Sequence, residues 1–469
     1  PPPTAVPQPL PVPPVAPPAP PPAPVYDGPF GVREAERLLW RGGFGPRPGE
    51  ARALADLGLA GAVAHLTRPA GTAALHGPEP VAGGAPLAPA DVHGHDHVWW
   101  LDRMVRSDQP LVERMALIWH DWFATSNADV NRADLMLAQN ELFRRRALGS
   151  FRELVHDVTV DPAMLVWLNG IDNRRGRPNE NYARELMELF TLGADRGAYT
   201  EADVRELARA LTGWRATWDA TTERLGDFRF DPTRFDATTK TLWAGTGHQR
   251  AGAFGWREAG DLCLENPYHR SFLVTKLWSS FVPTPADAGT QAWLEHLYLS
   301  GGFAVRPVVE AILLHPDLHR GPVLVKSPAV FAAGLLRGSG GTITTASWYS
   351  RGERAGQRLF QPPNVSGWND AAWLDTSTFL GRWELVVQAL DGRALTGAAM
   401  GPDTESPEAA LAAAVAFWGE PSLSDATRSA LLAFAAQPPP TDASTADWRA
   451  QRVNALRHLV AMSPDLQVS

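Results

Sequence analysis

Cysteine is almost absent from this chain, since Cys263 is the only one among 469 residues. A single thiol excludes an intramolecular disulfide and any zinc or iron–sulfur centre built from several cysteines. The sequence also lacks an apolar run of the roughly 18 residues that a membrane-spanning helix needs. We therefore expect no transmembrane segment and a fold held by a hydrophobic core, for which the 44% of hydrophobic residues are sufficient.

A surplus of positive charge is missing as well. The 43 basic residues are outnumbered by 51 acidic ones, which gives a net charge of −8. Proteins that bind nucleic acid neutralise phosphates with clustered Lys and Arg, so this balance argues against a nucleic-acid partner. The sequence contains no glycine-rich phosphate loop, no dinucleotide fingerprint and no Gly-x-Ser-x-Gly nucleophile elbow. These motifs therefore give no support for a nucleotide-binding enzyme or an α/β-hydrolase.

Proline, in contrast, is abundant at the start, where the chain reads PPPTAVPQPLPVPPVAPPAPPPAP. Proline removes backbone donors and favours an extended polyproline conformation without a core. We predict that residues 1–28 are a disordered tether of the kind that remains when an export signal is removed. This start favours an exported protein, located in the periplasm, on the cell surface or outside the cell.

Helical patterns dominate the remaining sequence, because apolar residues recur at spacings of three and four. The stretch from Arg215 to Gly247 differs, being rich in Thr, Asp and Phe with short alternating patterns. We predict an all-α fold with a multi-helix, bundle-like body and a small β or loop insertion around residues 215–250. The predicted division is a main helical domain at 29–392, a linker at 393–407, and a C-terminal helical segment at 408–469 that packs on the main domain.

The most informative stretch is NENYARELMELFTLG, residues 179–193. As a helix it separates a polar face from an apolar one: the polar face carries Asn181, Arg184, Glu185 and Glu188, and the apolar face carries Ala183, Leu186, Met187 and Phe190. Two interpretations stay open. The polar face is either a structural ion-pair network that includes an Arg184–Glu188 pair, or a functional site.

Candidate site residues follow from the functional interpretation. The candidate catalytic groups are Glu185, Glu188, Glu206, Arg184 and His120. The candidate substrate contacts are Asn179, Asn181, Lys240, Lys326, Asn364, Trp368 and Trp373. A carboxylate beside Arg184 should have a lowered pKa, which suits a base or nucleophile, so a general acid would need a more buried carboxyl.

Metal binding has two weaker candidates. His93, His95, Asp96 and His97 form the densest histidine cluster, in what we expect to be an extended loop. The loop NGIDNRRGRPNEN is rich in side-chain oxygens that could hold calcium, but it lacks the EF-hand spacing. Because short His-rich loops are more often solvated than metallated, we expect no bound metal and no cofactor.

Several motifs together resemble the bacterial domain of unknown function 1800 family. They include AERLLWRGGFGPRPGEARAL, ERMALIWHDWFATS, PNENYARELMELFTLG, RELARALTGW and LFQPPNVSGW, and the resemblance spans about residues 31–465. It implies an exported protein with a sulfatase-like exported partner. Two positions depart from the family pattern, because Trp122 and Phe235 stand where histidines are usual, while Asp236 and Lys240 remain.

The sequence thus leads to two hypotheses of different classes. The first is an exported hydrolase that acts on an extracellular or cell-wall polymer through the carboxylates of the 179–193 helix. The alternative is a non-catalytic exported binding or scaffold protein, in which the Arg–Glu network is structural and the aromatic loop around Trp368 and Trp373 holds a polymer or protein partner. Two carboxylates that converge in an open pocket would favour the enzyme, and a closed Arg–Glu lattice would favour the scaffold.

Overall fold

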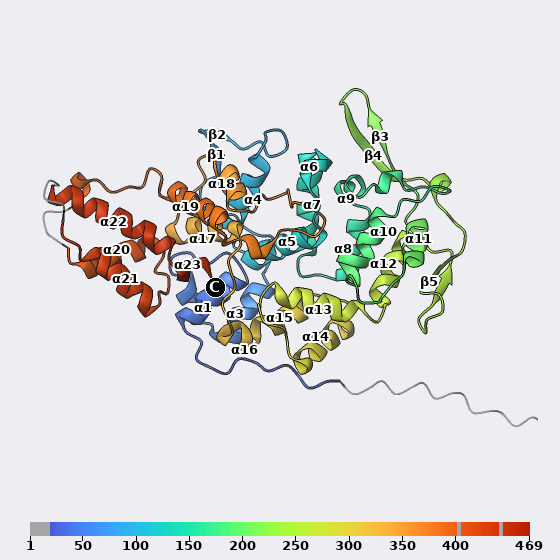
Figure 1. The fold of residues 1–469 in the computed structure, drawn as a ribbon, viewed down its shortest axis with the longest axis horizontal. Coiled ribbons are helices and arrows are strands. Elements are labelled where there is room, and N and C mark those ends of the chain that lie inside the picture. Colours follow the sequence, from blue (N-terminus) through green and yellow to red (C-terminus); the bar gives the residue numbers. More distant parts are fainter. Residues whose placement is uncertain (1–18, 401–404, 440–443) are drawn as a thin grey trace, which may run out of the picture.

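The computed structural model describes residues 19–400, 405–439 and 444–469. Most of the predicted tether, residues 1–18, lies outside the described residues. Residues 19–28 form no helix or strand, but the chain already touches the body at Tyr26, whose N–H donates to Leu314 O at 2.8 Å. Figure 1 shows a body built of helices, with the first described residues running along its lower edge.

The prediction of a predominantly helical fold is confirmed. The first half contains α1 (Val32–Arg41), α2 (Glu50–Ala55), α3 (Gly58–Thr67), α4 (His95–Arg106), α5 (Pro110–Phe123), α6 (Asn127–Val130), α7 (Ala133–Arg146), α8 (Phe151–Thr159), α9 (Pro162–Trp167), α10 (Asn181–Glu185) and α11 (Glu201–Ala210). The second half contains α12 (Trp256–Glu265), α13 (His269–Ser279), α14 (Ala288–Ser300), α15 (Arg306–Leu314), α16 (Pro316–Arg320), α17 (Pro328–Ser339), α18 (Trp348–Arg354), α19 (Thr376–Leu390), α20 (Pro407–Phe417), α21 (Asp425–Ala435), α22 (Thr445–Ala461) and α23 (Pro464–Gln467).

The predicted β insertion is also present. Strand β3 (Trp214–Asp219) pairs with β4 (Arg224–Phe230), and β5 (Lys240–Leu242) pairs with β6 (Arg250–Gly252), both antiparallel. The β3–β4 hairpin projects from the body at the upper right of Figure 1. A further short pair, β1 (Val81–Ala82) with β2 (Ala85–Pro86), lies outside the predicted insertion.

Helix α5 runs through the centre of the body and is buried along nearly its whole length. Trp119 is fully buried and Trp122 is 2% exposed, and their ring centroids lie 5.5 Å apart. The indole N–H of Trp122 donates to Phe190 O at 3.0 Å, which ties α5 to the segment after α10. Packed core residues therefore surround the polar side chains of α5 and fix their positions.

The C-terminal helices α20, α21 and α22 gather at the left of Figure 1. The chain end returns to the main body, since Val468 bridges Val325 in antiparallel fashion and Arg41 Nε donates to Ser469 O at 3.0 Å. Residues 401–404 of the predicted 393–407 linker lie outside the described residues, and the predicted domain boundaries remain a prediction. Within the described part of the chain, no helix has the length and apolarity required for a membrane crossing.

Candidate functional site

The central helix is not the uninterrupted α-helix that we predicted. It begins as α10 and continues as a π-helix, η2 (Leu186–Thr191). The Thr191 hydroxyl donates to Leu186 O, five residues back, and so supports the wider turn. π-helical turns are rare and occur frequently at functional sites, which made this face the first candidate.

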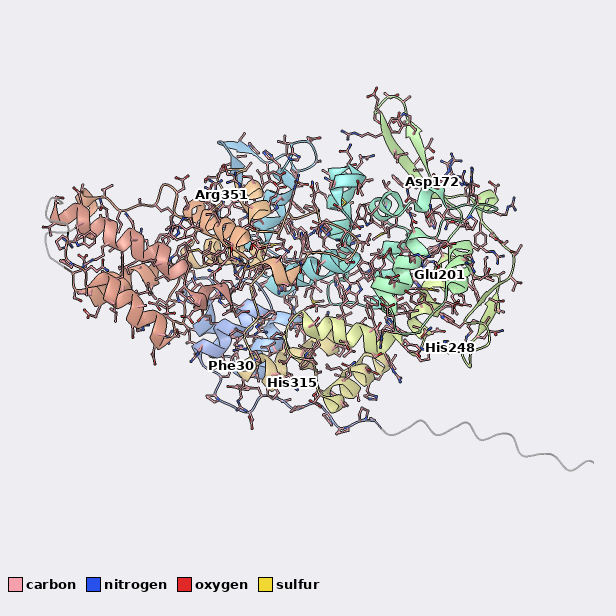
Figure 2. The ribbon with its side chains drawn as sticks, viewed as in Figure 1. Phe30, Asp172, Glu201, His248, His315 and Arg351 are labelled. Atoms are coloured by element: carbon pink, nitrogen blue, oxygen red, sulfur yellow. The ribbon has the colours of Figure 1, made fainter. Side chains whose placement is uncertain are left out.

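Arg184 does not pair with Glu188 as predicted. Its guanidinium donates to Glu201 at 2.6 and 2.8 Å and to Glu180 at 3.2 Å. Figure 2 labels Glu201 at the start of α11, next to α10. The Arg184 side chain is 33% exposed and that of Glu201 is 62% exposed, so this is a surface ion-pair lattice between two helices.

The two central carboxylates are also arranged differently from our expectation. Glu185 and Glu188 are half-buried, and Glu188 accepts a hydrogen bond from the Tyr199 hydroxyl at 3.2 Å. We expected Arg184 to lower the pKa of its neighbours, but burial and then the Glu188 charge raise the pKa of Glu185. The prediction was wrong because it considered only the positive charge of Arg184. The loss of water around Glu185 depends on the folded structure and raises its pKa.

The exposure of this lattice leads to a testable expectation. Replacing Arg184 by Ala should lower the free energy of unfolding by only about 0.5–1 kcal/mol, because exposed ion pairs contribute little. The effect should shrink further at high salt, which screens exposed charges. Urea unfolding at low and high ionic strength measures it, and a loss near 3 kcal/mol would show that the lattice is shielded from solvent.

Glu206 and Lys240 form structural contacts with neighbouring parts of the chain. Glu206 pairs with Arg209 at 2.7 Å and accepts the Thr241 N–H at 2.9 Å. Lys240 is fully buried, and its ammonium donates to Phe254 O at 2.8 Å. Burial alone would raise the pKa of Asp236, but hydrogen bonds from Arg209 and others outweigh it and lower that pKa to about 2. These groups hold the β insertion against α11.

Lys326 and the asparagines make similar local contacts. The Lys326 side chain is buried between Leu466 O, which accepts from its ammonium at 2.9 Å, and the ring of Trp40, 3.6 Å away. Asn179 Oδ1 accepts the Asn181 N–H at 3.0 Å. Asn181 in turn donates from its side chain to Asn169, and the side chain of Asn364 accepts the Ser366 N–H. These contacts shape loops and bring none of the four residues to a shared centre.

The histidine cluster lies mostly in a helix and not in the predicted loop. His95, Asp96 and His97 form the first turn of α4. Nδ1 of His95 accepts the Ala88 N–H and Nδ1 of buried His97 accepts the Leu359 N–H, both at 3.0 Å. The oxygen-rich loop is closed by its own hydrogen bonds, from Asn181 to Asn169 and from the Asn179 N–H to Asn173, and Asp172 is solvent-exposed (Figure 2). Across the described residues, no three His, Cys, Asp or Glu side chains converge as a metal site would require.

A pocket of about 80 Å³ lies instead beside α5. It forms where α5 meets the end of α13, the segment before α17, and the loop between α18 and α19. The lining residues are Arg114, Leu117, Ile118, Asp121, Ser279, Ser280, Leu324, Val325, Ser327, Gln357, Trp368, Asp370 and Trp373. We call this the α5 pocket. It contains two of the predicted substrate contacts, Trp368 and Trp373, and neither Glu185 nor Glu188.

Four charged groups act on one another at the α5 pocket. Burial lowers the pKa of Arg114 to about 10 and that of Lys276, on α13, to about 8. Burial raises the pKa of Asp121, although the hydrogen bond from the Trp368 N–H opposes the change. Loss of water and then the Asp121 charge raise the pKa of Asp370, at the exposed rim, to about 6. Two carboxyls and one guanidinium of the lining have shifted pKa values, and Lys276, outside the lining, acts on Asp121 through its charge. This combination marks the pocket as a candidate active site.

The geometry of the pocket is fixed from two sides. Trp368 N–H donates to Asp121 Oδ1 at 2.9 Å, and this contact orients the carboxylate. Behind the wall, the ring of His120 is 1% exposed and lies 5.5 Å from that of Trp368. Burial lowers the pKa of His120 to about 3, so the imidazole is neutral at physiological pH. Its Nε2 has no hydrogen-bond partner among the described residues, and we assign it to the pocket wall.

Gly367 is required for the approach of Trp368 to Asp121. Its φ of +89° disfavours any residue with a side chain, and an added Cβ would lie 2.3 Å from Asp121 Oδ1. Replacing Gly367 by Ala should therefore lower the free energy of unfolding by about 1–2 kcal/mol and displace the loop. Thermal unfolding measures the cost. Gly302 offers a matched control, because it also has a positive φ but its Cβ would meet nothing within 4 Å. If Gly367→Ala and Gly302→Ala lost the same stability, the proposed close approach of Trp368 to Asp121 would be contradicted.

Sequence reasoning missed four residues of this site: Arg114, Asp121, Lys276 and Asp370. None of the four was among the candidate site residues, and the segments that contain them are typical of ordinary helices and loops. The available signal was that Asp121 lies within the motif ERMALIWHDWFATS and that Asp370 follows LFQPPNVSGW by two residues, two motifs of the same resemblance. Nothing in the sequence shows that these two segments, far apart in the chain, share one pocket.

The fold and the site define a helical protein with a small pocket that is lined by acidic, basic and tryptophan side chains. A family model described as "Protein of unknown function (DUF1800)" matches residues 37–468, and the chain belongs to this family. This confirms the resemblance. No curated protein and no solved structure gives a significant match.

Proposed function

We propose that the protein is an exported hydrolase that cleaves an extracellular or cell-wall polymer at the α5 pocket. The observation that carries the proposal is the pair Asp121 and Asp370, two carboxyls with raised pKa values in a pocket walled by tryptophan. Enzymes that cleave polymers by acid–base catalysis separate the pKa values of two such groups, so that one donates a proton while the other accepts one.

The two carboxyls have different surroundings, which assigns their roles. Loss of water and the Asp121 charge raise the pKa of Asp370 to about 6, and its carboxyl lies at the exposed rim, where a leaving group would arrive. It is the proton donor. Asp121 accepts the Trp368 N–H and lies near Lys276 and Arg114, all of which favour its charged form. It is the base that takes a proton from the attacking water.

The reaction balances as a hydrolysis. The oxygen of water attacks the electrophilic carbon while Asp121 takes one of its protons. The bond to the leaving group breaks, and Asp370 supplies the proton that the departing atom needs. Trp368 and Trp373 present apolar surface to the substrate and displace water, which strengthens the electrostatic effects of both carboxylates.

The proposal is tested by incubating the full chain with purified peptidoglycan and with soluble extracellular polysaccharides, followed by mass spectrometry of released fragments. An Asp121→Asn variant serves as the matched control, because it keeps the shape of the side chain and removes its basicity. Fragments that appear with the wild type and not with the variant support the proposal. Equal release from both proteins, or none from either, would reject it.

A non-catalytic role has one specific observation in its favour. An open groove of about 620 Å³ between α19 and α22 is lined by apolar side chains, including Trp383 and Leu459. Exposed apolar patches of this kind mark protein interaction sites. A scaffold role, with a polymer or a sulfatase-like exported protein as partner, is therefore the second candidate, and it predicts that loss of Asp121 has no functional effect.

A further inference from the structure

We propose that a second groove, between the β3–β4 hairpin and α6–α7, binds a neutral polysaccharide chain with Trp218 as its stacking platform. We call it the hairpin groove. This inference rests on the proposed polymer hydrolase and names its substrate class. The groove has a volume of about 400 Å³ and is lined by Ala90, Val130, Asn131, Arg132, Ala133, Asp134, Leu135, Val166, Trp218, Glu223, Arg224 and Leu225.

Trp218 is the first element of the argument. Its side chain is 61% exposed, although Trp is a residue that proteins usually bury. The faces of an indole ring carry partial negative charge, and the C–H groups on one side of a sugar ring carry partial positive charge, so the two surfaces attract one another. An exposed Trp beside an open groove is therefore suited to stacking against successive sugars.

The hairpin that carries Trp218 is held in place and is not a free flap. Trp218 pairs with Leu225 in the strand register, directly after a bulge between Arg215 and Thr217. Bulges re-aim the side chains that follow them. From the position just before α7, Arg132 Nη1 donates to Leu225 O at 2.5 Å. The platform is thus fixed relative to α7 before a ligand arrives, which reduces the entropy lost on binding.

The polar part of the groove suits hydroxyl groups. Arg132 and Asp134 form a two-pronged pair, with distances of 2.7 and 2.6 Å, that fixes a planar set of donors and acceptors in the lining. A carboxylate oxygen accepts more than one hydrogen bond, so the pair keeps capacity for a ligand. Sugar hydroxyls both donate and accept, which matches such a mixed surface.

The charges of the lining select against ionic polymers. Arg132 and Arg224 are balanced by Asp134 and Glu223, so the groove has no net charge. Binding of an anionic polymer, such as a nucleic acid, needs a positive surplus. An uncharged glycan fits this balance, and an acidic or basic polymer does not.

The hairpin groove and the α5 pocket are connected by one segment. Helix α6 follows α5, and the Asn127 N–H at its start donates to Phe360 O at 2.8 Å, where the loop to Trp368 begins. Figure 1 shows α6 and α7 between α5 and the hairpin. Helix α6, whose last residue Val130 lines the hairpin groove, is therefore joined directly to the loop that carries Asp370.

The test is affinity electrophoresis of the full chain through gels that contain a neutral soluble polysaccharide: mixed-linkage β-glucan, glucomannan or glycol chitin. The wild type should be retarded by at least one of them. Trp218→Ala should weaken the binding about tenfold or more. Phe379→Ala, which removes another exposed aromatic side chain that lies outside all three of these pockets, should leave binding within about twofold.

The inference is overturned if no neutral polysaccharide retards the wild type, if Trp218→Ala binds as the wild type does, or if only polyanions or extended peptides bind. The Asp370→Asn variant separates this inference from the proposed function, because it should lose turnover and keep full retardation. Retardation that depends on Trp218, in a protein without hydrolytic activity, would uphold the binding groove and reject the hydrolase.

Discussion

Replacing Asp370 by Asn should reduce the rate of polymer hydrolysis by a factor of about 10²–10⁴, the range typical for loss of a general acid. An amide has the shape of the carboxyl but cannot donate the required proton. Because the pKa of Asp370 is about 6, the wild-type rate should fall roughly tenfold per pH unit above that value, as the acid loses its proton. The variant should lose this dependence on pH. Initial rates between pH 4 and 9 measure both effects.

Glu185→Gln is the matched control for this experiment. It changes another carboxyl with a raised pKa into an amide, but on the central helix and outside the α5 pocket. We expect its rate to stay within about twofold of the wild type. If Glu185→Gln abolished activity and Asp370→Asn did not, the catalytic site would lie on the 179–193 helix, as the sequence first suggested.

Replacing Lys276 by Met should make the protein more stable and less active. The pKa of Lys276 falls from its ordinary value of 10.5 to about 8, mainly through burial, so the charged lysine disfavours the folded state at neutral pH. Met keeps the apolar contact with the Trp122 ring, whose centroid lies 4.4 Å from the ammonium. We expect a gain of roughly 2 kcal/mol in the free energy of unfolding at pH 7. Turnover should fall at least about tenfold, because Asp121 loses a nearby positive charge.

The pH dependence has a definite sign. The folded-state pKa of Lys276 is lower than the unfolded one, so the unfolded state binds the proton more tightly. The loss of stability caused by burying the charged Lys276 is fully present below about pH 8, and it disappears as the pH rises towards 10.5. The stability difference between the variant and the wild type should therefore be largest at pH 7 and shrink at pH 10. Chemical unfolding at both pH values measures it.

Lys326→Met is the control for this second experiment. Burial also lowers the pKa of Lys326, to about 7, but its ammonium donates to Leu466 O, and the carboxylates that act on it are Glu36 and Asp465 and not Asp121. It should gain stability and keep its turnover. Equal losses of activity in the two variants would indicate a general effect of removing a buried lysine and would contradict a special role for Lys276.

The sequence predicted the helical class and the β insertion around residues 215–250, and the structure contains both. These depend on patterns within a few residues. The π-helical turn was missed because α and π turns bury nearly the same residues over so short a segment. The partner of Arg184 was missed because Glu201 lies on a different helix.

The α5 pocket could be predicted only in part. Trp368 and Trp373 stood out as aromatic residues in a Gly-rich loop, and the pocket contains both. Their relation to Asp121 depends on a contact between segments far apart in the chain, which needs Gly367 at a positive φ. The raised pKa of Asp370 depends on the loss of water at the pocket rim and on the charge of Asp121, and both arise only when the chain folds.

Carbon-13 NMR titration of side-chain carboxyls, with selectively labelled aspartate, tests the central claim without knowledge of the substrate. The Asp370 resonance is assigned by its disappearance in Asp370→Asn. Its pKa should be about 6 in the wild type and should fall in Asp121→Asn, because that variant removes the neighbouring negative charge. An Asp370 pKa near the ordinary value of 3.8, unchanged by Asp121→Asn, would contradict a coupled acid–base pair in the α5 pocket.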